Sequence, residues 1–424
     1  MRNRKGFILI FAYAVVSVIV ILVSVYVARS ISEMRTAVRD KDSASALYAA
    51  EAGIDFAFNW LKSQPSPPAG TAAFNITGGT ALSTGTYTVI IDPDDSNPTS
   101  FRKRYRIIAT GACNDSSRRV ILEVVQDTFA RHIWFTDSET YEGATVWFIT
   151  NDRLNGPTHT DGSFNISGDP WFGDETSQSG PSINYMHGGP PNDNPTFVEG
   201  ISFNVDASRM PTRATNLRNA SVLSGGMRLY GETTVVLNSN GTMNVTNANA
   251  GYNNTNMALP ANGAFFVENR IENRRLVEYG NVNVRGTLNG RLSIGANNNI
   301  RIGGNINYND AAGSDMLGLI AERDMIINQS ACPKNGDLTI QASMMAMSDS
   351  FSLENWQSSM KGTLNVLGGI IQKNRGPVGT FNINTNSKVS GFTKNYVYDE
   401  RLRTMPPPFF PTTEDFVPVS WREQ

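Results

Sequence analysis

The chain has 424 residues, with 36 Lys and Arg against 38 Asp and Glu, and a formal net charge of −2. This length suggests two or three structural units, and the balance of charge argues against nucleic acid as a partner. The 37 glycines and the abundant asparagines favour β-structure with tight turns, because both residues tolerate positive φ. The two cysteines, Cys113 and Cys332, exclude a disulfide-rich scaffold but could form one long-range disulfide in an oxidising compartment.

The N-terminus combines a short basic leader, residues 1–6, with a charge-free apolar run over residues 7–28. At ~1.5 Å per residue a helical run of this length spans roughly 33 Å, enough to cross a ~30 Å hydrocarbon core. The run is longer than the apolar part of a secretory signal peptide, so it predicts a retained single-pass membrane helix. The basic leader places the body outside the cytoplasm, although basic residues after position 28 weaken this bias.

The helical pattern continues beyond the membrane segment. Apolar residues recur at three- and four-residue steps up to Leu61, and a proline-rich stretch begins at Pro65. The sequence therefore predicts one helix over residues 7–62, roughly 80 Å long.

Residues 69–127 are predicted to form a β-rich connector. Strand patterns occur in its sequence, bounded by turn residues, at 86–92, 104–110 and 120–125. We expect this sheet to pack on the helix, with Phe56 and Leu61 on the helix side and Val89, Ile107 and Ile121 on the sheet side.

Residues 128–392 change in character. Short alternating apolar segments repeat between Gly and Asn turns, for example at 281–284, 291–294 and 299–302, with no helical stretch long enough for βαβ units. This pattern favours a parallel β-helix, a solenoid of stacked strands with Asn ladders at its corners, and a β-sandwich is the alternative. Residues 393–424 contain a polyproline-like stretch and are interpreted as a Pro-rich C-terminal cap.

The leader and helix carry a family resemblance. The basic leader ending in Gly6, followed by Phe7 and an apolar helix, resembles the class III signal of type IV pilins and type II secretion pseudopilins. That resemblance implies cleavage after Gly6 by a prepilin peptidase and methylation of Phe7. The segment Ala-Glu51-Ala-Gly53 resembles the corresponding segment of PilX-type minor pilins. Phe11 departs from the pattern, since most pilins carry a glutamate there, and this departure argues against a major-pilin role.

The body carries a second resemblance. Residues 154–172, 317–328, 368–381 and 398–411 look like a bacterial family of β-solenoid proteins whose function is unassigned and whose members often have a pilin-like N-terminus. The resemblance implies a location in the cell envelope and a fold, but no chemistry.

Candidate catalytic groups are sparse. The three histidines are His132, His159 and His187, and only His159 and Asp161 could form an imidazole–carboxylate pair on one strand face. Zinc needs three or four ligands, and no second histidine has ligand spacing. We therefore interpret this region, including the nearby Asp169 and Asp174, as a turn, and no catalytic or metal-binding residues are predicted.

Aspartates and aromatic residues leave two alternatives open. Some β-helices cleave polysaccharide with clustered aspartates, but turns also use Asp for local backbone bonds; the residues concerned are Asp310, Asp315 and Asp324. Aromatic side chains could form a sugar- or protein-binding strip, although core packing is favoured; they are Trp134, Trp147, Trp171, Phe172 and Tyr185.

Together these features predict a minor pilin-like or pilus-assembly protein that displays a solenoid, with a role in adhesion. Its partners would be the membrane, other pilin-like subunits and a prepilin peptidase, with surface polysaccharide as a further candidate. The alternative is a membrane-anchored β-helix that binds or cleaves polysaccharide. The expected location is the inner membrane, with the body outside the cytoplasm or on the cell surface. Neither a cofactor nor an enzymatic activity is predicted.

Overall fold

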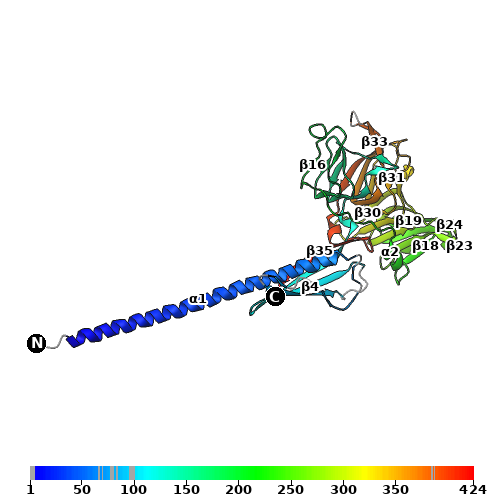
Figure 1. Cartoon of the computed structure of the whole chain (residues 1–424). Helices are drawn as coiled ribbons and strands as arrows, with labels where there is room; N and C mark the ends of the chain where they lie inside the picture. The colour runs from blue at the N-terminus through cyan, green and yellow to red at the C-terminus, as the bar shows by residue number, and fades with distance from the viewer. Residues whose placement is uncertain are drawn as a thin grey trace. The chain divides into compact units, whose positions relative to one another are not determined.

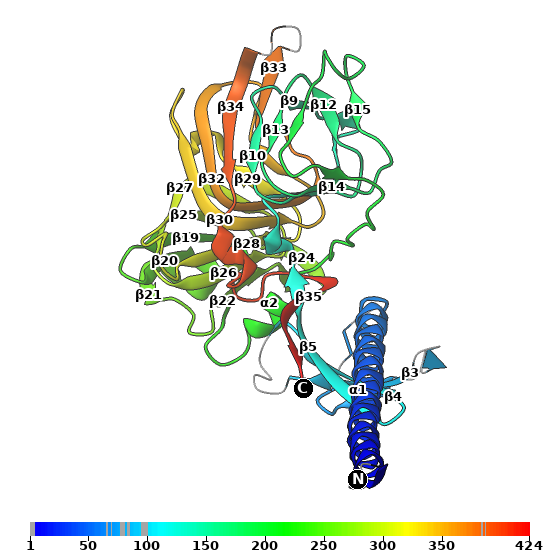
Figure 2. The same ribbon diagram turned by 90° about the vertical axis from the view of Figure 1, so that its left-hand side faces the viewer.

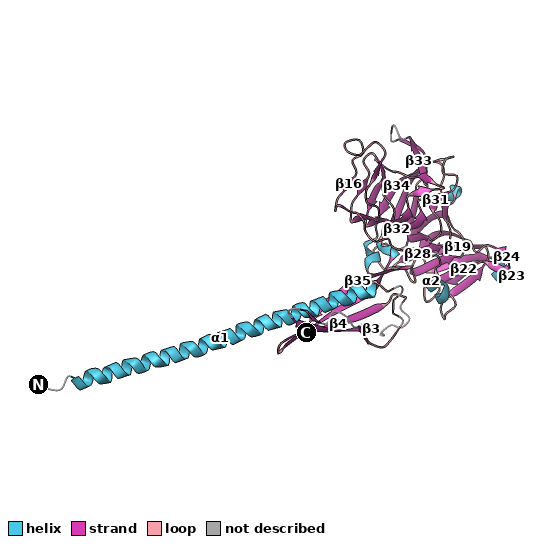
Figure 3. Cartoon of the chain, viewed as in Figure 1, coloured by secondary structure: helices cyan, strands magenta, loops and turns pink. Residues whose placement is uncertain are grey.

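The computed structural model describes residues 5–64, 67–68, 70–76, 81–82, 85–94, 101–382, 385 and 387–424, with the backbone alone at 5–7 and 81–82. The chain divides into two compact units (Figure 1). The helix–sheet unit comprises Met1–Gln126 and Asp415–Gln424, and the β body comprises Asp127–Glu414. Strands dominate and one long helix precedes them (Figure 3), which confirms the mainly β class with an N-terminal helix.

Helix α1 (Lys5–Lys62) has 58 residues and confirms the helix predicted over residues 7–62. Residues 8–41 are exposed on every side, and the helix is long and apolar enough to cross a membrane. At its end the Ser63 amide donates to the Asn59 carbonyl at 3.0 Å. Leader residues 1–4 and the predicted stop residue Pro65 lie outside the described residues.

The sheet of this unit has the order β1-β3-β4-β5-β35, with β2 paired to β3. Its strands are β1 (Phe74–Ile76), β2 (Ala81–Leu82), β3 (Gly85–Pro93), β4 (Arg104–Cys113), β5 (Ser116–Thr128) and β35 (Thr412–Glu423). The three strands expected in the connector correspond to β3, β4 and β5. The C-terminal strand was not expected: the Gln424 amide donates to the Arg119 carbonyl at 2.8 Å. The predicted cap over residues 393–424 is therefore wrong at its end, because β35 completes this sheet.

Small residues let α1 lie close to the sheet. The buried side chains of α1 follow a three- and four-residue spacing: Ala46, Ala49, Ala50, Ile54, Ala57 and Leu61. Gly53 continues this stripe, since a Cβ there would lie 3.0 Å from the Tyr87 ring and 3.1 Å from Ala109. On the sheet side, a Cβ at Gly111 would lie 2.0 Å from the Ala46 carbonyl oxygen.

The core between α1 and the sheet contains Leu61, Val89 and Ile107, as expected, and Phe56 packs against it. The residues of β5 in this core are Val120, Leu122 and Val124, and Ile121 is not among them. The prediction for Ile121 is wrong because residues 120–125 are apolar at successive positions, so the sequence alone does not fix which face is inward.

The β body consists mainly of parallel strands arranged in ladders. The first ladder contains, in spatial order, β18 (Met227–Tyr230), β22 (Ala264–Glu268), β26 (Arg291–Ala296), β28 (Met316–Ala321), β30 (Leu338–Ala346), β32 (Met360–Asn374), β6 (Trp134–Ser138), β11 (Thr158–Thr160), β14 (Thr176–Gln178) and β17 (Ile201–Ser202). In Figure 2 the strands β22, β26, β28 and β30 lie one above another. Such parallel pairing differs from the antiparallel sheets of a β-sandwich.

Two further ladders run alongside the first. The second contains β19 (Thr233–Asn238), β25 (Val282–Leu288), β27 (Ile300–Tyr308), β29 (Met325–Ile327) and β31 (Phe351–Leu353), and a separate parallel sheet contains β9 (Phe148–Ile149), β12 (Asn165–Ser167) and β15 (Asn184–Tyr185). The third joins the starts of β30 and β32 to β34 (Ser387–Val397), β10 (Arg153–Asn155), β13 (Trp171–Phe172) and β16 (Thr196–Phe197).

The body also contains hairpins and short helices outside the ladders or attached to them. They are β7 (Thr140–Tyr141) with β8 (Ala144–Thr145), β20 (Thr242–Asn247) with β21 (Tyr252–Ala258), β23 (Arg270–Glu272) with β24 (Arg275–Glu278), β33 (Gly379–Asn382) on β34, helix α2 (Thr215–Ala220), and the 3-10 helices η1 (Phe129–Arg131), η2 (Ala248–Ala250), η3 (Gln329–Ala331) and η4 (Glu400–Arg403).

The spatial order of the ladders is not the chain order. Along the chain, β6, β11, β14 and β17 come first. The strands from β18 to β32 follow them and lie on the other side of β6, with which β32 pairs. At this junction Ile370 lies opposite Trp134, and the Ile370 amide donates to the Ile133 carbonyl at 2.9 Å. We call this junction, where β32 pairs with the much earlier strand β6, the seam.

Registered apolar side chains form the core of the body. Ile294, Leu319, Met344, Ile370 and Trp134 stand opposite one another in consecutive strands of the first ladder, and all are buried. Stacking of like residues in this way keeps each inward row continuous.

Polar side chains join neighbouring segments just before strands of the second ladder. The Asn281 carbonyl oxygen accepts from Asn298 at 2.7 Å, and that of Asn299 accepts from the Asp324 amide at 3.2 Å. Only the first of these bonds joins two asparagines, so the Asn ladder at the corners of a solenoid stays a prediction.

The polyproline-like stretch packs along the side of the body. Phe410 is fully buried, and Pro407 and Phe410 lie against Gly318, where a Cβ would meet them at 2.9 and 3.0 Å. Pro408 lies in the same way against Gly263. This stretch therefore covers strand faces in the middle of the first ladder, and the prediction that it closes an open end is wrong.

Candidate functional site at the seam

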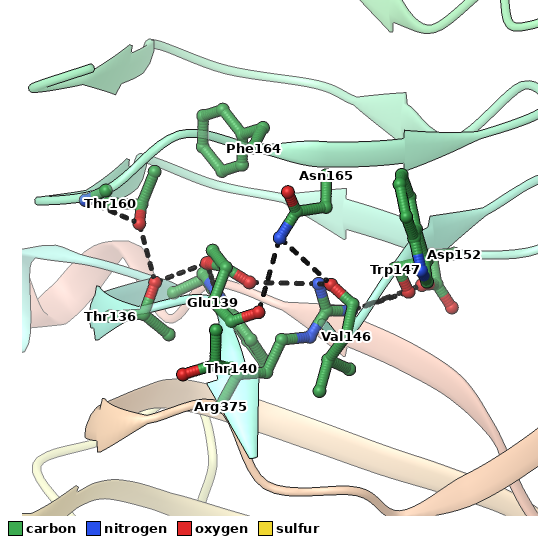
Figure 4. A network of polar contacts seen from close by, with 12 residues as sticks. Thr136, Glu139, Thr140, Val146, Trp147, Asp152, Thr160, Phe164, Asn165 and Arg375 are labelled. Atoms are coloured by element: carbon green, nitrogen blue, oxygen red, sulfur yellow. Dashed lines mark hydrogen bonds and ion pairs between the residues drawn. The ribbon is translucent and has the colours of Figure 1, made fainter. Parts of the chain in front are cut away.

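Four buried charged side chains meet at the seam. Arg375 follows β32, and its guanidinium lies 3.0 Å from a carboxylate oxygen of Glu139 and 3.7 Å from one of Asp152. Lys394 on β34 donates to both oxygens of Asp152, at 2.9 and 2.8 Å. Arg375 and Glu139 are each only 2% exposed and Asp152 only 1%. Figure 4 shows Arg375 pointing toward Glu139 and the Val146 carbonyl.

Backbone carbonyls and an aromatic ring also contact the Arg375 guanidinium. It donates to the carbonyls of Val146 and Trp147 at 3.4 and 3.2 Å, and its guanidinium lies 3.6 Å from the centre of the Phe148 ring. Glu139 also accepts from the Thr136 hydroxyl. A buried charge is tolerated where it is paired and hydrogen-bonded in this way.

The charged groups of the cluster shift the pKa values of their neighbours. Burial lowers the pKa of Lys394, Asp152 opposes this effect, and Arg375 reinforces it. Burial raises the pKa of the neighbouring Tyr396, and Asp152 reinforces the shift. Two cations face two carboxylates, which leaves the cluster without net charge.

A pocket of about 470 Å³ opens beside this cluster. Its walls come from the β7–β8 hairpin, the segment after Arg375, and the strands at the seam; the aromatic lining residues are Trp134, Tyr141, Trp147, Phe351, Trp356, Phe381 and Tyr396. Arg375 and Lys394 also line it. Its volume falls within the range of small-molecule sites, ~300–1,000 Å³.

A second cavity of about 560 Å³ adjoins this pocket along the outside of the second ladder. The two share Tyr141, Glu142, Trp356 and Gln357 as lining residues. Together they form an elongated depression, which we call the seam groove.

The pair of His159 and Asp161 considered from the sequence is present, but His159 lies on strand β11 and is buried, so the interpretation of this region as a turn is wrong for His159. The ring nitrogens of His159 lie 3.0 Å from an oxygen of Asp161 and 2.8 Å from the Ser177 hydroxyl, and the His159 side chain is 5% exposed. The same Asp161 oxygen accepts from the Ser208 amide at 2.9 Å. Both residues therefore have structural partners inside the body.

The other residues of that region lie elsewhere. Asp169 accepts from the Asn194 amide, while Asp174 pairs with Arg403 at 3.2 Å. His187 pairs with Asp193 at 2.8 Å. Among the described residues no group of three or more His, Cys, Asp or Glu side chains could hold a metal ion.

Two of the three candidate aspartates accept hydrogen bonds from backbone amides in turns. Asp315 accepts from the amides of Gly290 and Asp310 at 2.6 and 2.7 Å, and Asp310 accepts from the Ala312 amide at 3.0 Å. Burial raises the pKa of Asp324, and Asp349 reinforces the shift.

The two cysteines are free. Cys113 lies in the helix–sheet unit, and Cys332 lies in the β body, where its thiol is 3.4 Å from the Gly336 carbonyl. The disulfide considered from the sequence is therefore not formed.

At the N-terminus, the structure describes the backbone of Gly6 and Phe7 within α1, and Phe11 is exposed. Glu51 is half-buried, whereas Gly53 faces the sheet.

The aromatic strip, considered as the alternative to core packing, is not continuous. Trp134 and Phe172 are buried, Tyr185 and Trp171 lie outside the seam groove, and Trp134 and Trp147 line it. Sequence reasoning missed Tyr141, Trp356 and the charged cluster. Each stands alone among turn residues, and only the pairing of distant strands brings them together.

The fold defines a protein with a long apolar N-terminal helix, a small sheet and a large body of parallel ladders. A sequence family described as a domain of unknown function (DUF4900) matches residues 100–180. No curated protein matches the chain. Among solved structures, the competence-associated pilin ComZ from Thermus thermophilus is similar at 12% identity and a TM-score of 0.32, over 90% of this chain and 97% of that one. A TM-score of this size does not establish a common fold.

Proposed function

We propose that this protein is a type IV pilin-like subunit of the cell envelope, present in low copy number, that displays its β body outside the cytoplasm. The observation that carries the proposal is the division of α1. Residues 8–41 are bare, and their first part, residues 8–28, is apolar enough for a membrane or a bundle of like helices. The small-residue stripe from Ala46 to Leu61 instead binds the helix to a sheet.

We further infer that the β body is a parallel β-helix. Its parallel ladders, registered core rows and Asn side-chain bonds support this interpretation. Because β35 pairs with β5, the sequence of the body is an insertion between two strands that are neighbours in the sheet. A role for the body in adhesion is part of the proposal.

We also propose a binding rather than catalytic role. The fully hydrogen-bonded state of His159, with Asp161 and Ser177 on its two ring nitrogens, supports a structural function for that pair.

The proposal requires processing of the leader. A prepilin peptidase would cleave between Gly6 and Phe7 and methylate the new terminus. Intact-mass analysis of the membrane-extracted protein should show loss of residues 1–6, and Gly6→Leu should retain them. The matched control is Gly70→Leu, at a position with open space for a side chain. A wild-type protein that retains Met1 would contradict the pilin assignment.

Phe11 carries the proposal of low copy number. A repeating subunit must satisfy the buried terminal amine of its neighbour, and Phe11 offers no carboxylate. Immunogold labelling should therefore give isolated or terminal particles. Dense labelling along purified filaments would contradict this part of the proposal.

A further inference from the structure

The seam groove has the size and shape of a site for an elongated ligand. Its two cavities, of about 470 and 560 Å³, share four lining residues and so adjoin each other. Trp356 belongs to both cavities, Trp147 lines the inner one, and Tyr141 also lines both. All three side chains are partly exposed, so their rings are accessible from the groove.

The electrostatics of the groove disfavour an anionic ligand. Arg375 and Lys394 line the inner cavity, but each is already paired with a buried carboxylate. An anionic ligand would have to compete with Glu139 and Asp152, which lie within 3.0 Å of these cations. Glu142 and Glu354 line the groove as well and would repel an anion, while Arg301 pairs with Glu232 at 3.7 Å. The uncharged polar lining groups include Thr145, Gln357 and Thr380, which can donate and accept hydrogen bonds.

Aromatic rings combined with neutral hydrogen-bonding groups match the surface of a sugar ring. A pyranose presents C–H groups on its faces, which pack on aromatic rings, and hydroxyl groups around its edge, which need neutral partners. A purely aliphatic ligand would leave the polar lining groups unpaired, at a cost in free energy.

We propose that the seam groove binds a neutral glycan chain, with Trp356 as the central stacking residue where the two cavities join. Several sugar units are needed to occupy both cavities, so affinity rises with chain length. This inference does not rest on the pilin-like assignment, because a protein with an uncleaved leader would have the same groove.

The test uses the full chain, purified in a detergent without a sugar headgroup. Cellohexaose, maltohexaose and the hexamer of N-acetylglucosamine are titrated by calorimetry and by tryptophan fluorescence, with the corresponding dimers alongside. At least one hexamer should bind saturably and more tightly than its dimer. Trp356→Ala should weaken that binding about tenfold, in line with the loss of a central aromatic contact, and Trp356→Phe should retain most of it.

Trp421→Ala is the matched control, because Trp421 is 52% exposed and lies on β35 in the other unit. It should leave the Kd within about twofold of wild type. Thermal unfolding by circular dichroism verifies that each variant is folded. The proposal is overturned if no hexamer binds, if folded Trp356→Ala binds as wild type does, or if polygalacturonate or an apolar peptide such as N-acetyl-Leu-Phe-Leu-amide binds in place of the neutral glycans.

Discussion

Replacing Arg375 with methionine should strongly destabilise the β body. The substitution removes the cation 3.0 Å from Glu139, together with bonds to the carbonyls of Val146 and Trp147. Asp152 keeps Lys394 as a partner at 2.8 Å, so Glu139 is the carboxylate left buried without a cation. Breaking a buried pair by removing one partner costs about 3–5 kcal/mol. At roughly 2–4 °C per kcal/mol for a domain near this size, Tm should fall by roughly 6–20 °C.

The chain contains a matched control for this substitution. Lys373 and Asp137 form an ion pair across the same seam at 3.0 Å, but their side chains are 46% and 39% exposed. An exposed pair contributes at most about 1 kcal/mol, so Lys373→Met should change the free energy of unfolding by less than that amount. Both variants are compared in the full chain by thermal and urea unfolding, followed by circular dichroism.

A double variant separates the ion pair from general packing. Because replacing both partners of a buried pair is often nearly neutral, Arg375→Met with Glu139→Gln should recover at least half of the lost stability. The reasoning is refuted if Arg375→Met is as mild as Lys373→Met, or if the effects of Arg375→Met and Glu139→Gln simply add.

Two further predictions concern the helix–sheet unit and pH. Gly111→Ala should destabilise the packing of α1 on the sheet by about 2–3 kcal/mol, on the order of an overpacked core, because its Cβ would meet the Ala46 carbonyl oxygen at 2.0 Å. Gly70→Ala, with open space around it, should be neutral, and both variants are measured by thermal and urea unfolding. Burial, reinforced by Arg131 and His159, holds the pKa of His132 well below its usual value. As pH falls below about 6.5, the unfolded chain therefore binds a proton at His132 while the folded chain does not. The free energy of unfolding should then decrease by up to ~1.4 kcal/mol per pH unit. In urea unfolding at several pH values, His132→Leu should reduce this pH dependence by about one proton, and an unchanged pH dependence would contradict the assignment.

Local patterns predicted the elements but not their partners. The helix could be predicted because apolar spacing and the later prolines are local signals, and the short strands around Val282, Ile294 and Ile302 could be predicted because alternation is local as well. Ile121 shows where such a signal stops, since a run that is apolar at successive positions does not specify its inward face.

The long-range pairings had no signal of this kind. Nothing in residues 412–423 indicates that they join β5, which lies almost the whole length of the body earlier in the chain. The pairing of Ile370 with Trp134 is equally invisible, because any alternating strand of the same length offers an equivalent partner. Short strands of similar composition therefore indicate stacking, but not the order of the stack.

The same ambiguity explains why the candidate site was missed. At the seam the second ladder ends at β31, and the next parallel sheet begins at β9. Because β31 and β9 do not pair, the residues just before β9 have no strand partner in the second ladder. Carbonyls that a ladder would otherwise satisfy, those of Val146 and Trp147, accept instead from the Arg375 guanidinium. A buried cation then requires Glu139, and the irregular backbone around it leaves the open volume that forms the pocket. The charged cluster and the pocket thus lie at one place in the fold, the junction where β32 pairs with β6, and they should be lost together if that pairing is disrupted.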